Sequence, residues 1–336
     1  MALMPRESAK LIARLSKNVF IEEEGVKNLA CAILEGLKNH KINVNNFSQH
    51  EYHPSPDDPR AIDWIFILDT LNYSFWSKKG SLKWTVNGQT GYFALCAAIK
   101  RAIDEGKPIV DPEYYSRITR CDAEHIFRSD NQTSIPLLDE RLKSMRDAGK
   151  ILLERYQGTF VECVKLCSGS AEQLLKLVVN EFESYQDEAD YEGNRVSFYK
   201  RAQILVGDIW ACFKGEGFGK FHDIDYITMF ADYRVPQVLL HFGAIRYSNP
   251  FMSRLQCDVE LENGGDDEIE IRGCSIEAVE RVRDEVRSLF ERYPNLELKK
   301  SDINSVLIDH FLWDYRREHA AELEHIPFHK TRCIYY

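Results

Sequence analysis

The sequence has 336 residues, of which 44% are hydrophobic and 12% aromatic, and its formal net charge is −10. No apolar run is long enough to cross a bilayer, so we expect a soluble globular protein with no membrane partner. The lysines and arginines are scattered, which argues against direct binding to long nucleic acid but leaves room for a mononucleotide in a pocket.

The cysteines and the first residues of the chain both indicate a cytoplasmic protein. The nine cysteines form no CxxC pair, and Cys163 and Cys167 lie one helical turn apart without a second ligand pair nearby. We therefore expect reduced, mostly buried thiols in a cytoplasmic protein. The opening stretch MALMPRESAKLIARLSKN lacks the apolar core and cleavage site of a signal peptide, so it predicts a helix.

Helical periodicity dominates the chain, because apolar residues recur three or four positions apart. The segments with this spacing are 26–37, 92–103, 136–156, 171–185, 196–213, 235–247, 276–293 and 303–323. Ser170 with Gln173 predicts a capping box before one of them, and Ser301 followed by Asp302 precedes the last. The sequence therefore predicts a mainly α protein.

A few short strands interrupt the helices. Residues 83–86 precede Asn87-Gly88, a strong signal for a β-hairpin, and residues 257–261 and 268–272 flank a polar turn and predict a second one. The acidic run 184–194 predicts a helix end and a surface loop. Length alone suggests roughly two domains, but no linker or repeat divides the chain, so we expect one compact domain over residues 1–336.

Two polar stretches near the start of the chain are candidate binding elements. His50 and His53 lie three residues apart and could form half of a metal site, but no further ligands follow at metal spacing, so we expect no metal. The very apolar run 62–76 predicts a core helix. Its polar members, which need partners wherever they are buried, are Asp63, Asp69, Asn72 and Ser74.

Lys200 lies near the apolar face of the predicted helix 196–213, four positions before Ile204. A cation there could attract a phosphate or pair with Asp232. The alternative is a surface lysine whose aliphatic stem lies along the apolar face.

The glycine-rich turn 215–219 predicts a hairpin between two helices, because glycine permits positive φ and close backbone approach. After the turn, Ile224, Ile227 and Phe230 recur at helical spacing, and the run stops before Val235-Pro236. The sequence therefore predicts a second helix after the turn, with Asp232 near its end.

Asp232 is the candidate catalytic residue. A carboxylate held among apolar and aromatic groups can stabilise a positive charge that develops on a sugar carbon. The alternative is that Asp232 caps a helix and pairs with Arg234.

The last predicted helix places Asp314 and Tyr315 side by side, with His319 one turn beyond Tyr315. The apolar residues 311–313 should hold this turn against the core. A carboxylate, a phenol and an imidazole fixed there could bind a polar, cationic ligand, whereas the surrounding charged residues favour a solvated salt-bridge face as the alternative.

Three phrases carry a family resemblance. FADYRVPQ at 230–237, LDTLNYSFW at 68–76 and DYRREH at 314–319 together resemble the queuosine salvage family, the queuosine 5′-phosphate N-glycosylases, along nearly the full chain. The glycine turn followed by an aspartate also resembles the helix-hairpin-helix DNA glycosylases. The expected fold is therefore a helix-hairpin-helix glycosylase-like helical core with a minor β-hairpin.

The resemblance implies hydrolysis of queuosine 5′-monophosphate, which would free the base queuine without a metal or redox cofactor. Asp232 would stabilise the oxocarbenium-like sugar, Phe230 would stack on the base, and the run 62–76 would form a pocket wall. The residues that would hold the base substituents are His50, Asp314, Tyr315 and His319, and Lys200 is the candidate for the phosphate.

We expect a monomer, although composition does not fix the oligomeric state. Two other functions stay open. One is hydrolysis of another purine-like nucleotide. The other is a non-catalytic helical adaptor, which should expose an apolar groove and have no carboxylate at the bottom of a pocket.

Overall fold

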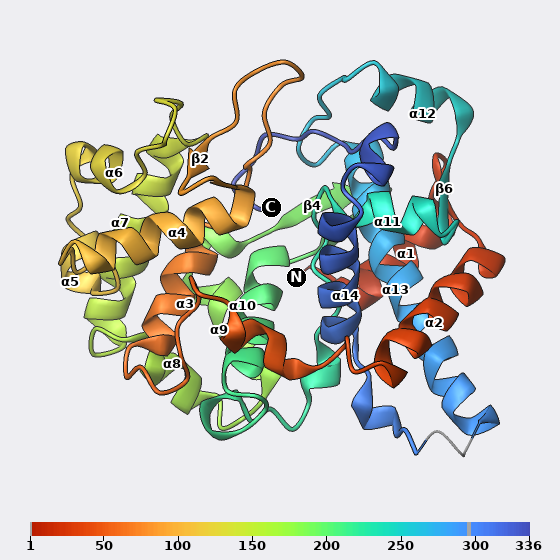
Figure 1. Cartoon of the computed structure of the whole chain (residues 1–336), viewed down its shortest axis with the longest axis horizontal. Helices are drawn as coiled ribbons and strands as arrows, with labels where there is room; N and C mark the ends of the chain where they lie inside the picture. The colour runs from red at the N-terminus through yellow and green to blue at the C-terminus, as the bar shows by residue number, and fades with distance from the viewer. Residues whose placement is uncertain (1, 294–296) are drawn as a thin grey trace. The chain divides into compact units, whose positions relative to one another are not determined.

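The computed structural model describes residues 2–293 and 297–336 (Figure 1). Within these residues the chain forms fourteen α-helices and three two-stranded antiparallel sheets, which confirms the mainly α prediction. No described helix is both long and apolar enough to span a membrane. The chain divides into two compact units. The first comprises Met1–Asn43, Asp187–Lys200 and Asp225–Arg332, and the second Val44–Gln186, Arg201–Ile224 and Cys333–Tyr336.

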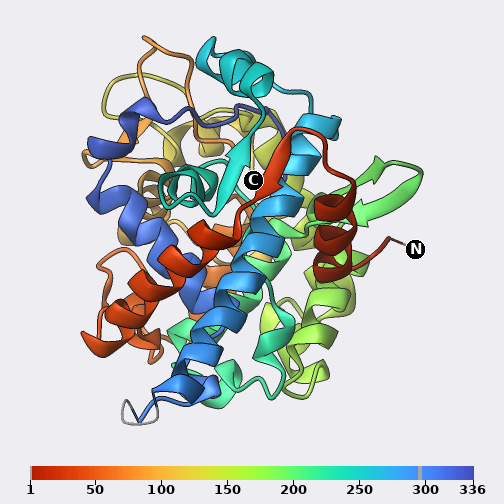
Figure 2. The ribbon, with the colours of Figure 1, turned by 90° about the vertical axis from the view of Figure 1, so that its right-hand side faces the viewer.

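The first unit is built around one long helix, α13 (Asp266–Arg292). Four helices pack on α13, as Figures 1 and 2 show. They are α1 (Pro5–Leu15), α2 (Glu23–Lys38), α11 (Val235–His241) and α14 (Ser305–Glu318). Close packing of α1 on α13 needs a residue without a side chain at Gly273, because a Cβ there would lie 2.6 Å from Ile12.

The first unit also contains two strand pairs, a short helix and short 3₁₀ turns. The strands β1 (Val19–Ile21) and β6 (Ile245–Tyr247) are antiparallel, as are β4 (Glu188–Tyr191) and β5 (Asn194–Ser197). The remaining elements are α12 (Asn249–Gln256), η6 (Lys300–Asp302) and η7 (Glu322–His325).

The second unit is a group of helices with one hairpin. Its helices are α3 (Ala61–Thr70), α4 (Gly91–Asp104), α5 (Pro112–Tyr115), α6 (Arg120–Ile126), α7 (Leu138–Arg155), α8 (Phe160–Leu166) and α9 (Ala171–Glu181). Its hairpin is β2 (Thr85–Val86) with β3 (Gln89–Thr90), and its 3₁₀ turns are η1 (Val44–Gln49), η2 (Glu183–Tyr185) and η3 (Gly217–Gly219). The helix α10 (Lys200–Cys212) starts at Lys200, which ends the stretch 187–200 of the first unit, and continues in the second unit. The turn η4 (Ile224–Tyr226) also spans a boundary between the units.

Several local predictions are confirmed. Helices cover 26–37, 92–103 and 276–292, most of 136–156, and residues 5–15 near the start of the chain. Asn87 and Gly88 both adopt positive φ, 51° and 71°, as the two-residue turn of a β-hairpin requires. The Ser170 side chain accepts a hydrogen bond from Gln173 N at 3.2 Å and so caps α9. Six of the nine cysteines are buried, as expected for mostly buried thiols.

Four helices were predicted too long. The segments 171–185 and 303–323 end in 3₁₀ turns, and 235–247 ends in β6 because Gly243, at φ 71°, terminates α11. The segment 196–213 begins with the end of β5. The helix end and surface loop expected at 184–194 are replaced in part by a hairpin, since residues 188–191 pair with 194–197 in β4 and β5.

The hairpin predicted from 257–261 and 268–272 is wrong. Residues 268–272 alternate charged and apolar side chains as a strand would, yet they lie in α13. Two features favour the helix. Asp266 and Asp267 stabilise its N-terminal turn, and the charged residues on the buried side have partners, as Arg272 has in Asp187 and Glu268.

The helix predicted after the glycine turn is also wrong. The turn at 215–219 follows α10, but only the short η3 and η4 lie between it and residue 226, and residues 227–234 have no helical structure. The next helix, α11, begins at Val235. Asp232 therefore lies in an irregular segment and not at the end of a helix.

Candidate active site

Residues 227–234 of the first unit form an extended segment that is held by side chains from two helices. Phe230 N donates to Asp309 Oδ2 of α14 at 2.9 Å, and Arg272 Nε of α13 donates to Ala231 O at 3.0 Å. Arg272 is itself fixed by a buried ion pair with Asp187, at 2.5 Å. Because buried backbone groups need partners, these bonds take the place of a helical hydrogen-bond ladder.

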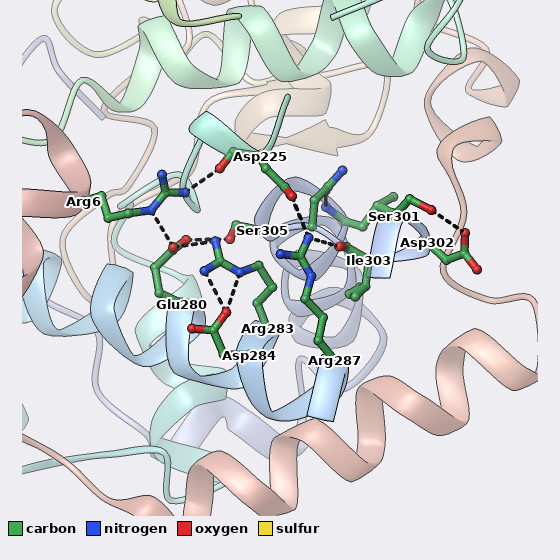
Figure 3. A network of polar contacts seen from close by, with 12 residues as sticks. Arg6, Asp225, Glu280, Arg283, Asp284, Arg287, Ser301, Asp302, Ile303 and Ser305 are labelled. Atoms are coloured by element: carbon green, nitrogen blue, oxygen red, sulfur yellow. Dashed lines mark hydrogen bonds and ion pairs between the residues drawn. The ribbon is translucent and has the colours of Figure 1, made fainter. Parts of the chain in front are cut away.

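A charged network fixes the residues that precede this segment (Figure 3). Arg6 donates to Asp225 O at 2.6 Å and to Glu280 at 2.7 Å, and Arg287 binds both carboxylate oxygens of Asp225 at 2.8 Å. Ser305, the first residue of α14, donates to Glu280 at 2.6 Å. The segment and α14 are therefore both anchored to α13.

Asp232 caps the helix that follows the segment. Its Oδ1 accepts from Arg234 N at 2.8 Å and from Val235 N at 2.9 Å, which confirms the capping alternative. The expected ion pair with Arg234 is wrong, because that guanidinium donates to Gln237 Oε1 at 3.2 Å and lies 3.8 Å from the centre of the Phe328 ring. Asp232 is half-buried, and its Oδ2 makes no hydrogen bond within the described residues. Capping by one oxygen thus leaves the other for a ligand.

Asp309, which the sequence analysis missed, lies beside Asp232. It is 5% exposed on α14. Burial raises the pKa of Asp309 well above its usual range and the charge of Asp232 raises it further, whereas the Phe230 N–H and the Lys200 ammonium lower it. Two carboxyl groups in unlike environments can differ in protonation, and this is the arrangement that acid–base sites use.

The Phe230 ring has a second neighbour on α14. It is 3% exposed and lies 6.4 Å from the His310 ring, centre to centre. Burial lowers the pKa of His310 to about 4, so this imidazole is neutral at physiological pH. Stacking of Phe230 on a base stays a prediction.

Tyr315 and His319 come together as predicted from their spacing. Their rings stack with centres 3.9 Å apart and planes at 13°. The Tyr315 hydroxyl lies 3.2 Å from His241 Nε2, a third member that sequence reasoning did not find. His319 Nδ1 lies 3.0 Å from the carbonyl oxygen of Tyr315. The cluster therefore joins the end of α14 to the end of α11.

Asp314 lies half-buried on the same helix as Tyr315. Burial raises the pKa of Asp314 to about 6, against the opposing charge of Arg317. In the part of the chain that the structure describes, no hydrogen bond or ion pair joins Asp314, Tyr315 or His319 to Asp232. The predicted site residues of the first unit thus fall into two sets, one around Asp232 and Asp309 and one at the end of α14.

His50 belongs to the second unit. Its ring stacks on Phe93 with centres 3.8 Å apart and planes at 4°, and its Nδ1 accepts from Tyr52 N at 3.3 Å. His53 uses one nitrogen with Phe47 O, at 2.8 Å, and the other with the Tyr92 hydroxyl, at 3.0 Å. Among the described residues, no three His, Cys, Asp or Glu side chains gather as metal ligands.

The run 62–76 lies in the second unit as well, and its first half forms α3, as predicted. Asp63 accepts from Phe160 N at 2.6 Å and from the Thr159 hydroxyl at 2.8 Å, so it holds the start of α8. This carboxylate therefore has a structural task. The role of 62–76 as a pocket wall stays a prediction.

Comparison with known proteins gives one consistent match. Residues 52–336 match the family described as queuosine salvage protein. The chain is 47% identical to a Bos taurus protein named queuosine 5′-phosphate N-glycosylase/hydrolase, with 99% of each chain covered. Proteins of the same name from Schizosaccharomyces pombe and Sphaerobacter thermophilus are 36% and 35% identical, with 98% of this chain and 99% and 96% of theirs covered.

Proposed function

The chain belongs to the queuosine salvage protein family, and from this premise we propose that it hydrolyses the N-glycosidic bond of queuosine 5′-monophosphate and releases queuine. The observation that carries the proposal is the position of Asp232. Its Oδ1 accepts from the backbone, its Oδ2 makes no hydrogen bond within the described residues, and its charge acts on the buried carboxyl of Asp309. Two neighbouring carboxyl groups destabilise the folded state, so a non-catalytic adaptor is not expected to contain such a pair.

In the proposed reaction the bond between C1′ and the base nitrogen breaks, water adds its hydroxyl to C1′, and a proton goes to the leaving base. The products are queuine and ribose 5-phosphate. Positive charge develops on the ribose as the bond breaks, and the Asp232 carboxylate stabilises it more than the neutral ground state. Oδ2 also orients the attacking water and accepts its proton.

Asp309 acts as a positioning residue in this scheme. It holds the backbone of Phe230, two residues before Asp232, and its raised pKa favours a neutral carboxyl beside the catalytic charge. The charge of Lys200 acts on Asp309, so we assign Lys200 to balancing the carboxyl pair as well as, from the sequence prediction, to attracting the phosphate.

Recognition of the base rests on the remaining predicted residues. Phe230 stacks on the base, and the secondary ammonium and diol of queuine are bound by a set of polar side chains. This set is His50, Asp314, Tyr315 and His319. Asp314 supplies the negative charge for the ammonium group.

The test is to incubate the pure protein with a panel of nucleoside 5′-monophosphates and with intact transfer RNA, and to assay released base. We expect queuine from queuosine 5′-monophosphate alone, because a chain of net charge −10 is poorly suited to a polyanion. Release from ordinary purine nucleotides or from transfer RNA would contradict this substrate. We further propose that the enzyme acts as a monomer in the cytoplasm, which light scattering and cell fractionation can check.

A further inference from the structure

Two arginines that the reaction scheme does not use point at one neutral acceptor. Arg234 is the last residue of the segment 227–234, directly before α11, and Arg316 lies on α14. Arg234 Nη1 donates to Gln237 Oε1 at 3.2 Å, and Arg316 Nε donates to the same oxygen at 3.3 Å. The Gln237 amide nitrogen donates to Ile326 O at 2.6 Å, which fixes the side chain so that its oxygen meets both guanidinium groups.

Neither guanidinium has an ion-pair partner within the described residues. The charges of Asp232 and Glu324 act on both from a distance. Two other arginines of the unit do have carboxylates in contact, since Arg272 has Asp187 at 2.5 Å and Arg287 has Asp225 at 2.8 Å. Arg234 and Arg316 differ from these two in that the acceptor they share is neutral.

Holding two like charges together costs free energy. Burial, together with the charge of Arg316, lowers the pKa of Arg234 to about 10. The Phe328 ring, 3.8 Å from the Arg234 guanidinium carbon, recovers part of this cost by a cation–π contact. An anion placed between the two guanidinium groups would offset the rest of this free-energy cost. A phosphate suits this position, because a guanidinium group can donate two hydrogen bonds to its oxygens.

We propose that Arg234 and Arg316, with Gln237 as their spacer, bind the 5′-phosphate of the substrate. The proposal rests on the proposed function. The anomeric carbon and the phosphorus of a nucleotide are joined only through the ribose and C5′, so the groups that act on them must be neighbours. Arg234 N donates to Asp232 Oδ1 at 2.8 Å, and the Arg234 and Arg316 guanidinium groups share the Gln237 oxygen, which places both arginines in the vicinity of Asp232. Two cations there also shield a phosphate from the catalytic carboxylate.

The first test compares two substrates on one variant. Arg316→Met keeps the aliphatic stem and removes the guanidinium. We expect kcat/KM for queuosine 5′-monophosphate to fall about 10- to 100-fold, as loss of a charge-assisted hydrogen bond implies, while kcat/KM for the nucleoside queuosine is unchanged. Arg316→Lys should restore part of the loss. The matched control is Arg246→Met, because Arg246 also stacks on a ring, Phe20 at 4.6 Å, but has a carboxylate partner in Glu22 at 2.8 Å.

Equal losses on nucleotide and nucleoside, or no loss on either, would overturn the phosphate assignment. If the wild-type protein released base from neither substrate, the proposed function would fail, and the arginine pair would still be tested by ligand binding. In that assay ribose 5-phosphate and inorganic phosphate should raise the Tm of the wild-type protein and of Arg246→Met, but not that of Arg316→Met. Ribose should raise none of them. Stabilisation of Arg316→Met by ribose 5-phosphate equal to that of the wild type would overturn the arginine site and leave Lys200 alone as the group that attracts the phosphate.

Discussion

Asp232 has two separable properties, a hydrogen-bond acceptor that caps α11 and a negative charge. The acceptor is Oδ1, which binds the backbone of Arg234 and Val235. An asparagine keeps such an oxygen and loses only the charge. An alanine loses both, at a cost of about 0.5–2 kcal/mol for the cap. Substitutions at this one position can therefore separate structure from catalysis.

The first prediction is that Asp232→Asn folds with nearly wild-type stability, binds nucleotide, and has almost no turnover. The transition state loses the charge that stabilises it, and water loses a general base typically worth about 10²–10⁴ in rate. Single-turnover kinetics and a melting curve provide the measurement, with Asp232→Ala as the variant that also loses the cap. Near-normal chemistry in the Asn variant would move the catalytic assignment to another residue.

The second prediction concerns pH and Asp314, whose pKa is raised to about 6 by burial. The raised value means that the protonated carboxyl stabilises the fold below about pH 4, the usual range of an exposed aspartate, and that this contribution is lost as the pH rises to about 6. The affinity for queuine changes with pH in the opposite direction, because only the ionised Asp314 carboxylate pairs with a secondary ammonium. Since the ionised fraction of Asp314 rises by about a factor of ten between pH 5 and pH 7, affinity for free queuine should rise by up to about 10-fold over this range.

Calorimetric titration of queuine across this pH range measures the effect. Asp314→Asn should bind weakly and without the rise. Glu318→Gln is the matched control, because the charge of exposed Glu318 raises the pKa of Asp314. Its removal should move the midpoint to lower pH and keep the rise. A pH-independent affinity in the wild-type protein would assign Asp314 to the surface salt-bridge face instead.

At the scale of elements, the catalytic segment depends on α14 for its shape. Phe230 N has its hydrogen-bond partner in Asp309, 79 residues further along the chain. The third prediction is that Asp309→Leu lowers the free energy of unfolding by about 1–3 kcal/mol, because the buried N–H loses its acceptor. Asp309→Asn retains an acceptor oxygen and resembles the protonated carboxyl, so it should unfold close to the wild-type midpoint.

Urea denaturation of both variants is the measurement. A leucine variant as stable as the asparagine variant would show that the segment does not need this anchor. The size of the difference between the two variants, and not the loss in either one, reports the hydrogen bond, because both remove the buried carboxyl.

The sequence predicted elements whose signals are local. The Asn87-Gly88 turn and the amphipathic helices were found because their determinants lie within a few residues. The helical spacing of Ile227 and Phe230 predicts a helix over 227–234, whereas the hydrogen bonds that hold this segment come from Arg272 and Asp309. Such long-range partners leave no mark on the periodicity.

The site was found in part for the same reason. Tyr315 and His319 lie one turn apart on one helix, so their stacking followed from spacing, but His241 lies 74 residues before Tyr315. Asp309 did leave a signal, a carboxylate inside the apolar run 306–312 that needed a partner. That signal predicts burial and pairing but does not identify the partner as the backbone of Phe230.

At the scale of the whole molecule, the chain passes repeatedly between its two units. It does so after residues 43, 186, 200, 224 and 332, so each unit is assembled from three separate segments. The catalytic segment, residues 227–234, begins two residues after Asp225, the first residue beyond one such crossing, and Lys200 ends another stretch of the same unit. Neither unit corresponds to one continuous stretch that could be cut from the chain.

The last prediction follows from this connectivity and bears on the single-domain expectation from the sequence. If one unit unfolded, the segments of the other unit would be joined only by long unfolded loops. Keeping the other unit folded would then cost additional loop-closure entropy. We therefore expect one calorimetric transition, in which the van't Hoff enthalpy equals the calorimetric enthalpy. Ribose 5-phosphate should move the whole transition to higher temperature, since a ligand that binds only the folded state stabilises everything that unfolds with its site. Two transitions, of which the ligand moved only one, would instead mean that the units fold independently and that the enzyme has two domains.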